Sequence, residues 1–142
     1  MDQSKQLMSI QKELNNLRET FIVFEDPKDK FIQLIDMAKN SGTLDDSEKT
    51  NINKISGCTS QAWVISKIND DDTYTFKTDS DSLIVKGLLL ILEKIFSNQP
   101  VDEVLSMNSN NILNAVGLEK IITSQRINGF SNAVEKIKSL VK

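Results

Sequence analysis

The chain has 142 residues, a formal net charge of −3 and a pI near 5.0. This length suits one domain with one hydrophobic core. Scattered lysines and an aromatic content of 6% argue against nucleic-acid binding, which requires a basic patch and stacking rings. The 39% hydrophobic and 26% charged contents are those of an ordinary soluble globular protein.

No membrane span or secretory signal is apparent in the sequence. The most apolar run, residues 83–95, contains Lys86 and is shorter than the roughly 20 apolar residues of a membrane span. A single cysteine and the absence of a signal-peptide pattern favour a reducing compartment. We therefore expect a cytoplasmic protein without membrane contact. The alternative is a plastid-type organelle, if a transit peptide has been removed.

Helical periodicity dominates the first part of the chain. Residues 4–19 carry one apolar stripe at spacings of three and four, formed by Leu7, Ile10, Leu14 and Leu17. The pair Asp26-Pro27 is typical of the start of a second helix. We assign residues 1–24 to an N-terminal helical extension and residues 25–142 to a single domain.

Three short strands are predicted in the middle of the chain. Ile52 and Ile55 mark the first strand, and residues 62–68 are rich in β-forming side chains. Residues 73–78 alternate between apolar and polar side chains. Because short turns join the three strands, we predict an antiparallel meander with Cys58 at the tip of its first hairpin.

The remainder of the chain is predicted to be helical. Residues 79–82 supply capping side chains for an apolar helix at residues 83–96. Two short helices follow, the second of which ends at Gly117, and Thr123 begins the last helix. The fold class is therefore α+β, a three-stranded antiparallel sheet packed with helices.

Cys58 is the only cysteine, and the chain contains no histidine. A lone thiol cannot close an internal disulfide or supply the ligands of a zinc or iron–sulfur site, so we expect no metal. It can act as one nucleophile or carry one group, although a Cys–His dyad is excluded. Activation then has to come from backbone dipoles, a lysine or arginine, or a partner protein. The ordinary alternative is a buried core cysteine.

Three blocks of sequence resemble a known family. Residues 57–63 are similar to the Gly-Cys-x-Ser-Gln-x-Trp signature of the SufE family, the sulfur-acceptor proteins of iron–sulfur cluster assembly. Residues 79–87 look like that family's Asp-Ser-Asp-x-x-Ile-Val-Lys/Arg-Gly segment, and residues 124–129 are similar to its Ser-Arg-x-Asn-Gly ending. The blocks occur in the family's order, and the resemblance covers residues 27–142.

The resemblance implies a SufE/IscU-like fold and a role in sulfur relay. Cys58 would accept persulfide sulfur from a SufS-like, pyridoxal-phosphate-dependent cysteine desulfurase, stimulate that enzyme, and deliver the sulfur to a SufBCD-type scaffold. The chain would then be a transfer partner rather than an enzyme in its own right. It would need no cofactor, since the pyridoxal phosphate belongs to the desulfurase.

The resemblance also implies roles for individual residues. Support of the Cys58 loop and its pocket is expected from Gly57, Ser60, Gln61 and Arg126. The surface that binds the desulfurase is expected to include Asp79, Asp81 and Lys86. For the two aspartates, helix capping is the ordinary alternative.

Three other functions remain open: an iron–sulfur scaffold, a thiol redox sensor and a purely structural binding module. The single cysteine argues against the first two, because a scaffold uses several cysteines and a sensor needs a resolving thiol. A binding module would tolerate the replacement Cys58→Ser.

Overall fold

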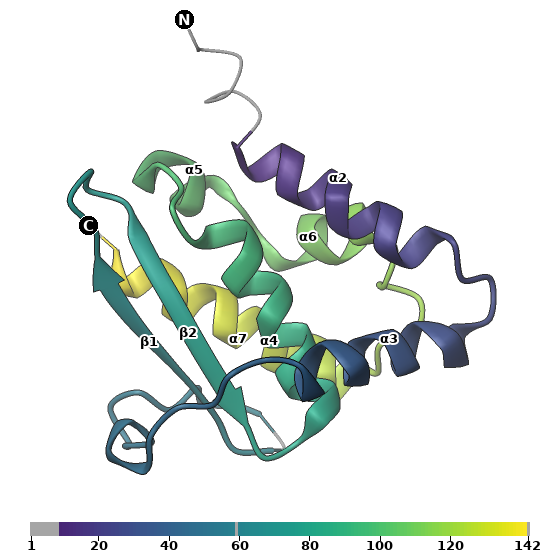
Figure 1. Cartoon of the computed structure of the whole chain (residues 1–142), viewed down its shortest axis with the longest axis horizontal. Helices are drawn as coiled ribbons and strands as arrows, with labels where there is room; N and C mark the ends of the chain where they lie inside the picture. Colours follow the sequence, from purple (N-terminus) through teal and green to yellow (C-terminus); the bar gives the residue numbers. More distant parts are fainter. Residues whose placement is uncertain (1–8, 59, 142) are drawn as a thin grey trace, which may run out of the picture.

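The computed structural model describes residues 9–58 and 60–141, and within them it has the predicted α+β class (Figure 1). The elements in chain order are α2 (Ser9–Ile22), α3 (Pro27–Lys39), the 3₁₀ turn η1 (Asp46–Glu48), β1 (Ala62–Ile68), β2 (Tyr74–Ser80), α4 (Leu83–Phe96), α5 (Val101–Ser106), α6 (Ser109–Val116) and α7 (Ser124–Leu140).

Strands β1 and β2 form an antiparallel pair with Ala62 opposite Ser80 and Ile68 opposite Tyr74. The other edge of β2 faces α4, so β1 lies at the rim of the molecule (Figure 1). None of the helices in the described part of the chain has the length and apolarity that crossing a membrane requires.

The predicted third strand is wrong. The chain turns at residues 51–53, and Lys54 forms an isolated antiparallel bridge to Trp63 instead of a strand. Ile52, which the prediction placed in the strand, is 85% exposed. Asparagines on both sides of Ile52 favour a turn over an extended strand, so the segment left for pairing is too short.

Most helix ends follow the predicted capping residues. The Asp26 carboxylate accepts a hydrogen bond from Lys28 N, and Gly117 ends α6 with a φ of 81°. The cap of α4 is Ser82, whose hydroxyl accepts a hydrogen bond from Val85 N. Asp79 belongs to β2 instead, so the capping role predicted for it is wrong.

Helix α2 begins at Ser9, and Leu7 lies outside the described residues. Its side chains Leu14, Leu17 and Phe21 are buried in the same hydrophobic cluster as α4 and α7. The proposed domain boundary after residue 24 stays a prediction, while the packing of α2 joins it to the common core.

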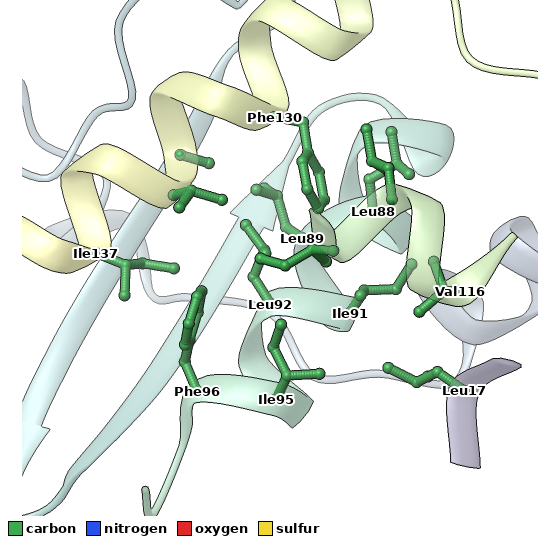
Figure 2. Packing of buried hydrophobic residues seen from close by; sticks show 14 of the residues in the cluster. Leu17, Leu88, Leu89, Ile91, Leu92, Ile95, Phe96, Val116, Phe130 and Ile137 are labelled. Carbon is green, nitrogen blue, oxygen red and sulfur yellow. The ribbon is translucent and has the colours of Figure 1, made fainter. Parts of the chain in front are cut away.

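Helix α4 is the centre of this core. Nine of its 14 residues are buried, as expected for a helix that is apolar on nearly every side. Figure 2 shows Leu89 directed toward Phe130 of α7 and Ile91 directed toward Val116 at the end of α6. The single helix thus connects the sheet to the other helices.

Helices α3 and α4 are in close contact at Gly87. A Cβ atom on Gly87 would lie 2.5 Å from the backbone oxygen of Leu34, nearer than real Cβ contacts. The glycine therefore permits this approach of the two helices, at the cost of conformational entropy in the helix interior.

We predict that Gly87→Ala destabilises the protein by about 1–3 kcal/mol, because overpacking outweighs the gain of about 0.5–1 kcal/mol in helix propensity. Thermal unfolding followed by circular dichroism measures the change. Gly42→Ala is the matched control, since a Cβ there meets no atom within 4 Å. Equal stability of the Gly87 variant and the wild type would contradict this account of the helix contact.

Candidate functional site

Cys58 is half-buried and faces helix α7. Its Sγ donates a weak hydrogen bond to the backbone oxygen of Gly129 at 3.8 Å. A pocket beside the sulfur has a volume of about 20 Å³, which is of the order that one water-sized atom requires. Its other lining residues come from α4 and α7: Val85, Leu88, Leu89, Gln125, Arg126, Gly129 and Phe130.

The loop that carries Cys58 is anchored at both ends. On the upstream side, Ile55 N donates to Ala62 O at 2.8 Å and Val64 N donates to Asn53 O at 2.9 Å. These two bonds join residues 53–55 to the start of β1 and form the stem of the loop. Cys58 therefore lies beyond a fixed stem, close to the predicted hairpin tip.

On the downstream side, residues at the end of β2 hold the backbone of Gln61. Gln61 N donates to the Asp81 carboxylate at 3.1 Å. Gln61 O accepts hydrogen bonds from Asp81 N at 3.2 Å and from the Ser80 hydroxyl at 2.7 Å. Asp81 is exposed, and its carboxylate fixes the loop while its outer surface stays open to solvent.

Two glycines make the contact between the loop and α7 possible. Gly57 has a φ of 80°, and a Cβ on it would lie 2.0 Å from Nδ2 of Asn132. A Cβ on Gly129 would lie 3.0 Å from the Cys58 sulfur. A larger residue at Gly57 would be strained by the positive φ and would displace the Asn132 side chain, and one at Gly129 would press on the Cys58 sulfur.

Burial raises the pKa of the Cys58 thiol. The uncharged thiol suits its surroundings, because S–H can donate to the Gly129 carbonyl whereas a thiolate would face that oxygen. Arg126 is the one charged residue among those that line the pocket in the described chain. The site therefore stabilises a resting thiol rather than a reactive thiolate.

The residues predicted to support Cys58 lie in different positions relative to it. Gly57 lies in the loop and allows its close approach to Asn132, Arg126 lines the pocket, and Gln61 anchors the loop through its backbone. Ser60 is half-buried next to this anchor, and Thr59 lies outside the described residues. Their functional roles stay predictions.

Two of the three residues predicted for the partner surface are buried. Asp79 and Lys86 are each 4% exposed, so neither presents a surface as this chain is folded. Burial alone would raise the pKa of Asp79, but hydrogen bonds from Leu44 N and Ser80 N and the charges of Lys86 and Lys49 lower it. The pairing of these charges across elements explains why they are tolerated inside.

Lys86 ties helix α4 to strand β2. Its ammonium group donates to Thr78 O and lies 3.9 Å from the Glu93 carboxylate. Burial lowers the pKa of Lys86, while the charges of Glu93 and Asp79 oppose that effect. These contacts hold in place the strand whose end anchors Gln61.

Sequence reasoning missed the apolar walls of the pocket and the contact of Asn132 with the loop. Val85, Leu88 and Leu89 belong to a helix that is apolar all round, so no pattern marks which side faces Cys58. Gly129 did carry a signal, because a glycine inside a helical pattern often marks a close approach.

The residues of the three sequence blocks converge here, since Cys58, Asp81, Val85 and Gly129 all surround one loop. The family model described as the Fe-S metabolism associated domain, SufE, matches residues 15–141. The chain belongs to the SufE family. This membership associates it with iron–sulfur metabolism.

Relatives of known name agree with the SufE assignment. An uncharacterized SufE-like protein of Rhizobium meliloti is 30% identical over 129 residues, which cover 89% of this chain and 92% of that protein. The cysteine desulfuration protein SufE of Wigglesworthia glossinidia brevipalpis is 26% identical over 123 residues, 87% of this chain and 85% of its own length.

The fold agrees with a solved structure as well. A hypothetical protein from Thermus thermophilus, solved in solution, covers 89% of this chain and 91% of its own, with a TM-score of 0.71 and 15% identity. At that identity the likeness supports the fold alone. Within the described residues of this SufE chain, no group of three or more Cys, Asp or Glu side chains could hold a metal ion.

We predict that Asp81→Ala frees the downstream anchor of the loop and increases the rate at which iodoacetamide alkylates Cys58 in the folded protein. A hydrogen bond to a charged acceptor contributes about 1.5–3 kcal/mol to stability. The bond from Gln61 N to the exposed Asp81 carboxylate contributes less than this. Asp81→Asn, which keeps an acceptor oxygen, is the control and should react nearly as slowly as the wild type. Equal rates for the alanine variant and the wild type would exclude Asp81 as an anchor.

We predict an acid-dependent loss of stability through Asp79. Because its pKa is lowered on folding, the unfolded chain takes up this proton more readily than the folded chain. The stability that ionised Asp79 contributes is therefore complete above the ordinary pKa of 3.8, and it is lost as the pH falls through the lower pKa of the folded state. Urea unfolding of wild type and Asp79→Asn between pH 7 and pH 3 tests this, since the variant should be less stable at pH 7 and lose less on acidification.

Proposed function

We propose that Cys58 accepts sulfur from a cysteine desulfurase and carries it as a persulfide. The position of the single thiol is the observation that supports this proposal. It lies at the tip of an anchored loop, beside a pocket with space for about one more atom. The family and the name of the Wigglesworthia relative point to the same chemistry.

The transfer is a displacement at sulfur. The Cys58 thiolate attacks the terminal sulfur of the desulfurase persulfide, a new S–S bond forms, and the sulfur–sulfur bond of the donor breaks. The donor cysteine leaves as a thiolate and takes up a proton, while Cys58 has lost one. No electron acceptor is needed, because one S–S bond replaces another.

Because the pKa of Cys58 is raised, the thiol must be deprotonated before this transfer can occur. The resting thiol is protonated and partly sheltered, and the chain contains no histidine that would remove the proton. Activation therefore requires the bound desulfurase, which positions the donor sulfur and provides a base or a compensating charge. Arg126, at the pocket, is the residue of this chain suited to stabilise the negative charge that develops on sulfur.

The remaining steps of the proposal concern partners. The chain stimulates a SufS-like desulfurase and passes sulfur to a SufBCD-type scaffold, so it is a transfer partner that has no pyridoxal phosphate of its own. Asp81, exposed beside the loop, is the one of the three predicted surface residues positioned to meet the desulfurase. The cytoplasm is the proposed compartment, with a plastid-type organelle as the alternative.

We predict that incubation with a matched cysteine desulfurase and free cysteine increases the intact mass of the wild-type protein by one sulfur atom. A thiol reductant should remove the added mass. Cys58→Ser should gain no sulfur, because a hydroxyl is not a nucleophile toward persulfide sulfur under these conditions.

The circular dichroism spectrum and melting temperature of Cys58→Ser serve as controls for folding. Cys58 is not one of the large fully buried side chains, so the variant should fold normally. Sulfur uptake by the folded serine variant would contradict the assignment of Cys58. Absence of uptake by the wild type with an active desulfurase would instead favour a binding module.

A further inference from the structure

The two outer edges of the sheet differ in how their hydrogen-bonding groups are satisfied. On β2, groups from α4 and the residues that follow it cap the outward backbone. The bonds run from Phe76 N to Ser97 Oγ (3.0 Å), from Thr78 N to Glu93 Oε2 (2.8 Å), from Asn98 N to Tyr74 O (2.7 Å) and from Lys86 Nζ to Thr78 O. This edge is closed to any further strand.

The outer edge of β1 has hydrogen-bond partners only at the start of the strand, within the described residues. Val64 N is bonded to Asn53 O, and beyond that point the chain segment turns away. Outward groups alternate along an antiparallel strand, so those of Ser66 and Ile68 face the same side as Val64 N. Among the described residues they have no backbone partner, and Figure 1 draws this strand at the rim of the molecule. We call residues 65–68 the open edge.

The open edge combines positive charge with exposed apolar surface. Lys67 lies on it and Lys54 lies at the bridge next to it, and both are exposed. Ile68 is 57% exposed and Ile52 is 85% exposed. Acidic groups lie at the turn beyond the strand, in residues 70–72.

A second copy of this chain fits the open edge poorly. The antiparallel self-pairing that leaves Asn53 in place and keeps residues 66–68 of both copies paired within β1 sets Ser66 opposite Ile68 and therefore Lys67 opposite Lys67. Like charges in direct cross-strand contact are destabilising. The alternative register, centred on Ser66, requires the space beside Val64 that Asn53 occupies. A segment of opposite charge meets neither obstacle.

We propose that the open edge of β1 is a docking site for an extended, acidic segment of a partner protein, which adds as an antiparallel strand. The added strand continues the line of residues 53–55, which already pair in this sense. Acidic side chains on one face of the added strand then lie opposite Lys67, and apolar side chains on its other face cover Ile68. Because residues 53–55 form the stem of the Cys58 loop, the partner is held directly beside that loop. The proposal does not depend on Cys58 carrying sulfur.

The test uses the full chain labelled with ¹⁵N and a synthetic peptide of four Glu-Val repeats. We expect the amide resonances of Ser66 and Ile68 to shift saturably and their hydrogen exchange to slow. Lys67→Glu should weaken the peptide affinity about tenfold, because an attractive cross-strand pair becomes repulsive. Ser66→Pro should weaken it as well, since it removes one outward N–H without touching the bonds to β2.

Lys77→Glu is the matched control. Lys77 is exposed on β2, opposite Ile65 on the same sheet, but away from the open edge. Reversing the charge of Lys77 should change the affinity for the Glu-Val peptide less than twofold. Equal losses for Lys67→Glu and Lys77→Glu, or a Lys-Val peptide that binds as tightly, would overturn the proposal in favour of unspecific binding. Concentration-dependent dimerisation that Ser66→Pro abolishes would assign the edge to a second copy and equally overturn it.

Discussion

Helix α4 is apolar on nearly every side, and the rest of the fold encloses it. The sheet covers one face through β2, while α3, α7 and α2 cover the others. Burying this many apolar side chains supplies most of the driving force for folding. The same helix forms one wall of the pocket through Val85, Leu88 and Leu89, so the Cys58 thiol lies against a helix of which most residues are buried.

The site joins segments that lie far apart in the sequence. Gln61 is bonded to Asp81, and Cys58 contacts Gly129, so the loop is held between the end of the sheet and the last helix. Each of the three sequence blocks that resemble SufE contributes to this loop. The blocks are thus explained by one local requirement, namely a cysteine that is sheltered yet near the surface.

The sequence predicted the helices well because their apolar spacing and caps are local signals, as at Asp26, Gly117 and Thr123. It also predicted Cys58 as the candidate site. It failed where the decisive partner lies elsewhere in the chain. Lys86 and Asp79 look like surface charges in sequence, since charged side chains are rarely buried unless paired, and their partners are on other elements. The prediction of a third strand failed because a turn leaves too few residues to pair with β1, and only an isolated bridge at Lys54 forms.

The double anchoring of the Cys58 loop also limits how far the cysteine can travel. Three residue steps separate Cys58 from Ile55 on one side and from Gln61 on the other. A fully extended chain spans about 3.5 Å per residue, so the Cys58 backbone stays within roughly 10 Å of either anchor. Such a short tether cannot carry a group from one distant protein to another. Any partner that exchanges a group with Cys58 must bring its own reactive atom to this corner of the molecule.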